Sequence, residues 1–173
     1  MKKYILFLFL AFALTSAFSQ SETKFNLHPE TGEIYYSEVI NIEGKSKNDL
    51  FVSARTWFAN TFVSSKNVIQ YSDKKEGIII GKGNFKVKNG RVNFTVKISS
   101  REGRFKYELY NFIYDAGIIQ THGDLRQEKK SGGGMWPSHW RKARKQAMVH
   151  IPKLIISLND GMIISKVLPK DDW

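Results

Sequence analysis

The sequence predicts an α+β fold, a two-layer sandwich in which an antiparallel sheet carries two helices on one face. Two segments, residues 46–62 and the residues after Pro137, repeat apolar side chains at helical spacing along a single stripe. Between them, short segments alternate apolar and polar residues with a period of two, as strands do. Helices with one apolar stripe and strands with one apolar face fit a sheet that is covered on one side only.

Length and composition indicate one folded domain. The chain has 173 residues, of which 42% are hydrophobic and 13% aromatic, enough to bury a core and too many for wholesale disorder. There are 27 lysines and arginines against 16 aspartates and glutamates, so the formal net charge is +11. Because cysteine is absent, the sequence excludes a disulfide framework, thiolate catalysis and zinc held by cysteine.

The N-terminus has the pattern of a secretory signal peptide. Lysines at positions 2 and 3 precede an apolar run over residues 4–14, and small residues follow at Ala17 and Ser19. The run is well short of the roughly 20 apolar residues that span a bilayer. We therefore expect cleavage after Ser19 and a single domain over residues 20–173, with its core at 27–160. No cysteine follows the run, so we expect a soluble periplasmic or extracellular protein and not a lipoprotein.

The domain is expected to begin with a strand over residues 33–43 and a helix that starts at Ser46. Glu38 falls on the apolar face of the strand. A buried carboxylate with a raised pKa would be a functional candidate, whereas a place near a strand edge or beside a lysine would not. In the helix, Ser46 is the expected N-cap, and Asp49 three residues later completes the pattern of a capping box.

Strands fill the middle of the chain. A short strand is expected at 68–71, and two longer strands flank Asn89-Gly90, the pair most typical of a tight hairpin. After a turn at 101–104, the apolar phase shifts next to Leu109, which predicts a β-bulge there.

Two glycines of this region, Gly81 and Gly83, lie on the apolar side of their strand. They flank Lys82 without the remainder of any nucleotide-binding fingerprint. We expect them to permit close packing of a helix on the sheet.

The last helix is expected to begin at Pro137, after a loop over residues 126–136. Its apolar stripe consists of Trp140, Ala143, Ala147, Ile151, Leu154, Leu158 and Met162. Pro152 lies within this stretch and lacks the N–H that a helix interior uses, so we expect a kink or break just before it. Residues 159–161 (Asn-Asp-Gly) have the composition of a helix cap, and 162–168 fit either a helix or a strand. The resulting order is β-α-β-β-β-β-α.

A set of residues in this order forms a recognisable pattern. Its members are Pro29, Gly32, Ile34, Tyr36, Val39, Ile40, Gly44, Ser46, Lys47, Leu50, Ala54, Trp57 and Phe58, with 68–70, 80–83 and the hairpin through Phe94. The pattern resembles a domain family of unknown function from exported Bacteroidetes proteins, which has a TATA-box-binding-protein-like (TBP-like) fold. The resemblance covers residues 27–160 and implies that fold and an exported setting. It brings no catalytic residues, and the fold name does not indicate DNA binding.

The sequence contains no motif of a known catalytic or cofactor site. None of its four histidines forms a zinc-binding His-Glu-x-x-His motif, and Gly-x-Ser-x-Gly and P-loop motifs are absent. His122 and Asp124 offer two metal ligands at most, and a solvated loop explains them better. We therefore expect no enzymatic activity, no cofactor and no metal.

Positive charge gathers in two groups, and both are candidate sites for an anionic partner. The first lies on the polar face of the expected sheet and consists of Lys82, Lys86, Lys97 and Lys106, with Lys88 and Arg91. Glu108 is the only acid that we place on this face. The second falls in residues 126–153, a segment with eight basic residues and one acid. The candidate residues of this second group are Trp136, Trp140, Arg141, Arg144 and Lys145. A solvated helix face is the alternative explanation of the second group.

These observations favour a non-enzymatic binding module for an anionic envelope component, whether a glycolipid, an acidic glycan or an acidic protein surface. Two alternatives stay open. A hydrolase of unrecognised type would bring Glu38, His122 and Asp124 together in one pocket. Nucleic-acid binding through the basic surface is the other, and we expect no specific nucleic acid because an exported protein rarely meets this ligand.

Overall fold

The computed structural model describes residues 24–62, 65–116, 122–125 and 137–164, so the predicted signal peptide lies outside the described residues. The elements, in chain order, are β1 (Tyr36–Asn41), α2 (Lys47–Thr61), α3 (Ser65–Val68), β2 (Ile69–Asp73), β3 (Ile78–Val87), β4 (Gly90–Arg101), β5 (Arg104–Asp115), β6 (His122–Asp124) and α4 (Pro137–Ile164). The predicted order is confirmed, with the short elements α3 and β6 added. None of the described helices is long and apolar enough to cross a membrane.

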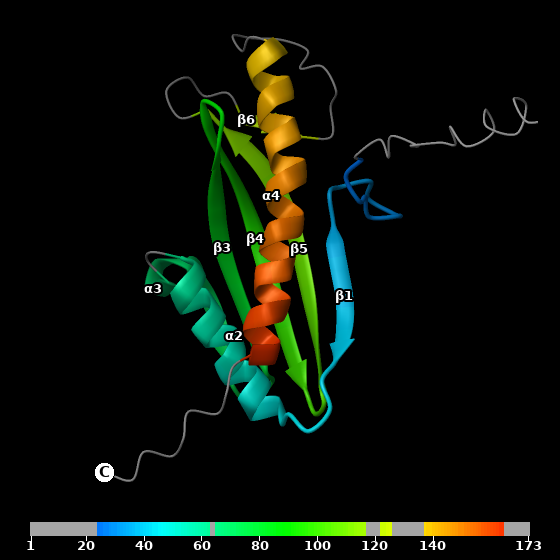
Figure 1. Ribbon diagram of the computed structural model, residues 1–173, viewed down its shortest axis with the longest axis vertical. Coiled ribbons are helices and arrows are strands. Elements are labelled where there is room, and N and C mark those ends of the chain that lie inside the picture. The colour runs from blue at the N-terminus through cyan, green and yellow to red at the C-terminus, as the bar shows by residue number, and fades with distance from the viewer. Residues whose placement is uncertain (1–23, 63–64, 117–121, 126–136, 165–173) are drawn as a thin grey trace, which may run out of the picture.

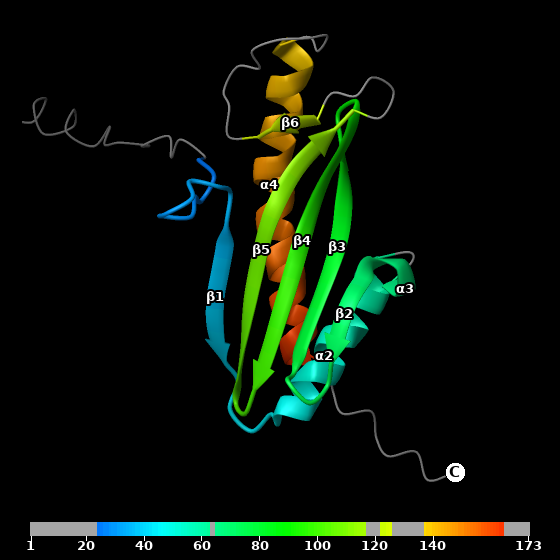
Figure 2. The ribbon, with the colours of Figure 1, turned by 180° about the vertical axis from the view of Figure 1, so that it is seen from behind.

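The sheet is antiparallel throughout and has the strand order β1-β5-β4-β3-β2, with β6 paired to the end of β5. Helices α2 and α4 lie side by side on one face of this sheet, and no described helix lies on the other (Figures 1 and 2). The predicted two-layer α+β sandwich is therefore confirmed. The core fills the space between the helices and the covered face.

The start of α2 has the predicted capping box. The Ser46 hydroxyl accepts a hydrogen bond from the backbone N–H of Asp49 at 3.1 Å. The Asp49 carboxylate in turn accepts one from the backbone N–H of Ser46 at 3.2 Å. Two N–H groups that the helix itself leaves without partners are thereby satisfied.

The glycines of β3 permit the close approach of α2, as predicted. A Cβ on Gly81 would overlap the ring of Phe58, and a Cβ on Gly83 would overlap the ring of Phe62. Both aromatic rings therefore lie directly on the backbone of β3. Any side chain at these two positions would push α2 away from the sheet.

Helix α4 runs without a break from Pro137 to Ile164, so the break expected before Pro152 is absent. Pro152 is exposed on the helix surface, whereas the predicted apolar stripe is buried on either side of it, for example at Ile151 and Leu158. The packing of this stripe compensates for the hydrogen bond that a proline removes. The expected cap at 159–161 is also wrong, because the helix continues through these residues.

Gly161 has a packing role inside α4 instead. A Cβ at this position would crowd the indole of Trp57 on α2. The same indole donates a hydrogen bond from Nε1 to the Ser157 hydroxyl at 3.3 Å. These two contacts hold α2 and α4 together as one layer.

The predicted bulge lies in β5. Thr95 of β4 pairs with Tyr110, but Asn93 pairs with Ile113, so β5 has one extra residue in this interval. Asn111 adopts a left-handed backbone conformation with φ of 55°. The extra residue changes which side chains of β5 face the helices, and it returns Phe112 to the core.

Candidate functional site

The side of the sheet that faces away from α2 and α4 is here called the open face (Figure 2). Its basic side chains, placed by strand alternation and register, are Lys82, Lys86, Arg91, Lys97, Arg101, Arg104 and Lys106. The first group of candidates predicted from the sequence therefore shares one surface, except for Lys88, which lies in the turn between β3 and β4. These cations differ sharply, however, in what lies next to them.

Glu108 lies between the two lysines at the middle of the open face and offsets part of their positive charge. Its carboxylate lies 3.4 Å from the Nζ of Lys97 and 3.1 Å from the Nζ of Lys106. The hydroxyl of Tyr35 donates a hydrogen bond to the same carboxylate at 2.7 Å. We call these four residues the paired centre.

The pKa values within the paired centre agree with this geometry. Burial raises the pKa of Glu108, but the hydrogen bonds from Tyr35 and Lys106 and the nearby lysine charges outweigh it, so the pKa lies below its ordinary value. The pKa of Lys106 is raised, chiefly by its hydrogen bond to Glu108. Lys97 and Lys106, both predicted as anion ligands, thus already have an anionic partner within the chain.

A second region of the open face, here called the basic end, consists of Lys82, Lys86 and Arg91. Lys86 pairs directly with Arg91 across β3 and β4, next to the hairpin turn, and Lys82 follows on the same face of β3. Both lysines are exposed, and neither forms an ion pair with another described residue. The Nε of Arg91 lies 3.6 Å from a carboxylate oxygen of Asp115.

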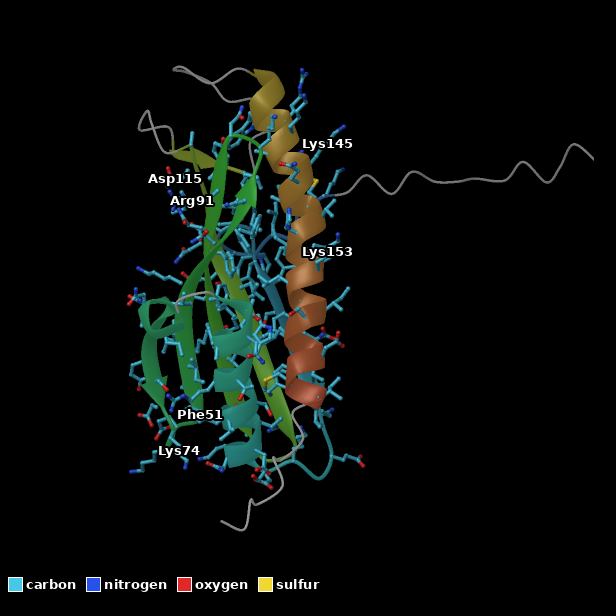
Figure 3. The ribbon with its side chains drawn as sticks, turned by 60° about the vertical axis from the view of Figure 1, so that its left-hand side comes forward. Phe51, Lys74, Arg91, Asp115, Lys145 and Lys153 are labelled. Carbon is cyan, nitrogen blue, oxygen red and sulfur yellow. The ribbon has the colours of Figure 1, made fainter. Side chains whose placement is uncertain are left out.

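A shallow hollow of about 320 Å³ lies at the basic end. Its lining consists of Asn84, Lys86, Gly90, Arg91, Asp115 and Ala116. Gly90 is required here because a Cβ would overlap the backbone oxygen of Asp115. Figure 3 shows Arg91 and Asp115 together on the side of the sheet away from α4.

Asp115 was missed by the sequence analysis, which placed Glu108 as the only acid on this face. Asp115 pairs with Arg91 in the register, and Asp73 on the edge strand β2 pairs with Ile78, so both belong to the open face. The bulge in β5 shifts the alternation after Tyr110. A count by twos from Glu108 therefore assigns the wrong face to every later residue of the strand.

The second predicted group does not form part of this site. Trp140 is 1% exposed and packs edge-on against Tyr114, with ring centroids 5.5 Å apart. Arg144 donates a hydrogen bond from Nε to the backbone oxygen of Leu125 at 3.1 Å, and its guanidinium lies 5.3 Å from the centre of the Phe25 ring. Trp140 and Arg144 are therefore structural residues, which corrects the prediction.

The other members of that group lie elsewhere. Arg141 and Lys145 are exposed on α4, and Figure 3 shows Lys145 on the opposite side of the molecule from Arg91. Trp136 lies outside the described residues. The exposed cations of α4 thus lie on the opposite side of the sandwich from the open face, and they cannot contact one small ligand together with its cations.

Glu38 lies far from the strand β6, which contains His122 and Asp124. It lies on the edge strand β1, exposed, and accepts a hydrogen bond from the hydroxyl of Tyr107 at 3.1 Å. Burial, followed by this hydrogen bond, raises the pKa of Tyr107 to about 12. Glu38 pairs with Tyr107, whereas β6 pairs with 113–115, a separation of roughly 20 Å along β5. Its position on an edge strand agrees with the interpretation that Glu38 is not a buried functional carboxylate.

No group of three potential metal ligands occurs among the residues that the structure describes. The side chains of the open face offer charge and hydrogen bonding. Cations, an amide and a carboxylate line a surface hollow at one end, and an ion-paired cluster occupies the middle.

Comparison with known proteins agrees with this architecture. Residues 36–115, from β1 to the end of β5, match the family described as "Domain of unknown function (DUF4468) with TBP-like fold". No curated protein sequence matches the chain.

Two solved structures are similar to the whole sandwich. A TBP-like protein from Parabacteroides distasonis has a TM-score of 0.61 and 13% identity, covering 77% of this chain and 94% of the other. A DUF4468 family protein from Bacteroides ovatus has a TM-score of 0.61 and 14% identity, covering 79% and 90%. At these identities the likeness concerns the fold. Residues 36–115 therefore match the DUF4468 family, and the chain has the TBP-like fold of these two structures.

Proposed function

We propose that this protein is a non-enzymatic binding module that holds an anionic partner on its open face. The observation that carries the proposal is the direct pairing of Lys86 with Arg91, with Lys82 nearby on the same face. Like charges directly opposite each other in a sheet are destabilising. A negatively charged group bound between them would relieve that repulsion.

The contrast with the paired centre supports this assignment. Lys97 and Lys106 are compensated by Glu108, whereas Lys82 and Lys86 have no carboxylate partner among the described residues. The uncompensated lysines of the open face therefore lie at the basic end. Arg101 and Arg104 also lie directly opposite each other at the other end of this face, but the hollow lies at the basic end. We assign binding to the basic end, and not to the four lysines equally.

We place this activity outside the cytoplasm, because residues 1–19 have the pattern of a signal peptide. Intact-mass measurement of the exported protein tests this part of the proposal. We expect a chain that begins at Gln20, and a retained Met1 in a membrane fraction would contradict it.

Binding to immobilised dextran sulfate tests the main proposal, because this polymer offers negative charge without other specific chemistry. The test variant is Lys82→Gln/Lys86→Gln/Arg91→Gln. The control, Arg141→Gln/Lys142→Gln/Lys145→Gln, removes the same charge from the exposed side of α4. We expect the test variant to lose most of its retention at low salt and the control to keep most of it. Equal losses of retention in both variants would show that binding depends on net charge alone. A larger loss in the control would show that the binding site lies on α4.

A further inference from the structure

The hollow at the basic end contains a mixture of charges that restricts its ligand. Two cations, Lys86 and Arg91, line it together with the carboxylate of Asp115 and the amide of Asn84. We propose that this hollow binds one uronate unit of an acidic glycan. This inference rests on the proposed function and names the chemical class of the anionic partner.

The carboxylate of the sugar lies between Lys86 and Arg91. These residues are directly opposite in the register, so their Cβ atoms are about 5 Å apart. Arg91 directs its Nε toward Asp115, which leaves the two terminal nitrogens of its guanidinium to bind a carboxylate. Lys86 contributes a second positive charge from the other strand.

The hydroxyl groups of the sugar lie toward Asp115 and Asn84. A carboxylate has about four acceptor positions, so Asp115 can accept hydrogen bonds from hydroxyl groups while it stays paired with Arg91. The amide of Asn84 both donates and accepts hydrogen bonds, as a sugar hydroxyl does. Gly90 and Ala116 complete the lining without bulky side chains, which leaves room for a pyranose ring.

A phosphate group fits this lining less well. A phosphate dianion between Lys86 and Arg91 would lie close to the negative charge of Asp115, which opposes its binding. A uronate has a single negative charge at one end and neutral hydroxyl groups at the other. The arrangement of charge along the hollow therefore matches the sugar acid.

The size and position of the hollow indicate a single unit within a longer chain. Its volume of about 320 Å³ is at the lower limit for ligand pockets. Lys82 lies four residues from Lys86 on the same face of β3, about 13 Å further along the strand. It is placed to meet another acidic unit of the same glycan.

Calorimetric titration with tetragalacturonate, its neutral methyl ester and inorganic phosphate tests the inference on the chain from Gln20 to Trp173. The wild type should bind the acid and not the ester. Asp115→Asn should weaken binding of tetragalacturonate about fivefold to tenfold, as the loss of one or two hydrogen bonds predicts, while it strengthens binding of phosphate. The matched control Asp73→Asn removes the same charge at the far edge of the open face and should not weaken either ligand.

A second variant, Asn84→Ala, keeps the inference testable if Asp115→Asn does not fold. It should weaken binding of tetragalacturonate severalfold and weaken retention on dextran sulfate less, because that retention depends on the cations of the basic end. Tighter binding of both tetragalacturonate and phosphate by Asp115→Asn would overturn the inference, because the hollow would then be a simple anion site. Retention on dextran sulfate without binding of tetragalacturonate would overturn the inference and leave the proposed function intact. Failure to bind either would overturn both.

Discussion

The paired centre and the basic end occupy the same strands of the open face and contain similar cations, but only the centre provides its lysines with a carboxylate. Lys97 lies directly across from Glu108, whereas Lys86 lies directly across from Arg91. The first arrangement stabilises the sheet and the second opposes it. Positive charge on a surface therefore indicates a binding site only where the fold leaves it uncompensated.

The largest expected effect comes from removal of the carboxylate at the paired centre. Glu108→Gln should lower the free energy of unfolding by about 2 kcal/mol, because the amide keeps one acceptor oxygen but loses the negative charge that pairs with Lys97 and Lys106. Urea denaturation measures this. The variant should also bind dextran sulfate more tightly than the wild type, since Lys97 and Lys106 are then uncompensated. Unchanged stability and binding would mean that the two regions do not differ as described.

The pH dependence of stability sharpens the same point. Because the pKa of Glu108 is lowered in the folded protein, its ionised form stabilises the fold at pH values above the ordinary glutamate pKa of about 4.3. This contribution is lost as the pH falls through the folded value. The difference in stability between wild type and Glu108→Gln should therefore shrink between about pH 5 and pH 3. Denaturation at several pH values checks this, and a constant difference would contradict it.

Tyr35→Phe removes one hydrogen bond to Glu108 and leaves both lysines in place. We expect a loss of about 1 kcal/mol in the free energy of unfolding. Tyr71→Phe is the matched control, because the Tyr71 hydroxyl donates to Asp73 at 3.2 Å on an exposed part of the same face. Urea denaturation of both variants should show the larger loss for Tyr35→Phe. Equal losses would assign no special role to the paired centre.

The smallest expected effect has the opposite sign. Lys86→Gln removes one of two like charges that face each other, so it should raise the free energy of unfolding by about 0.5 kcal/mol at low salt. Lys97→Gln, one strand away, should lower it because an ion pair with Glu108 is lost. Both effects should diminish at high salt. A lower free energy of unfolding for Lys86→Gln would contradict the claim that repulsion between Lys86 and Arg91 destabilises the basic end.

Much of the fold could be predicted because it depends on local patterns. The capping box of Ser46 and Asp49 lies within four residues, and the alternation in β4 assigns its faces directly. The glycines at 81 and 83 were expected to admit a helix, and they lie against Phe58 and Phe62. The buried place of Trp140 also follows from its position in the helical stripe. Its interpretation as a surface ligand ignored that signal.

The candidate site was predicted only in part. Lys82 and Lys86 were found from alternation alone, but the compensation of Lys97 and Lys106 by Glu108 depends on the register of two strands. Asp115 lies on the open face because the extra residue of the bulge at Asn111 reverses the alternation of the residues after it. A count along the chain shows which side of a strand a residue occupies, but not which residue lies across from it.

The sequence by itself determined the element order, the one-sided covering of the sheet and the faces of its regular strands, because helical and strand periodicities are local properties of the chain. The tertiary structure decided which lysines stay uncompensated, why Gly90 must lack a side chain, and that α4 continues through Pro152. These outcomes depend on contacts between residues far apart in the chain. The free energy of such contacts can outweigh a local conformational preference. These outcomes therefore cannot be predicted from the local sequence pattern.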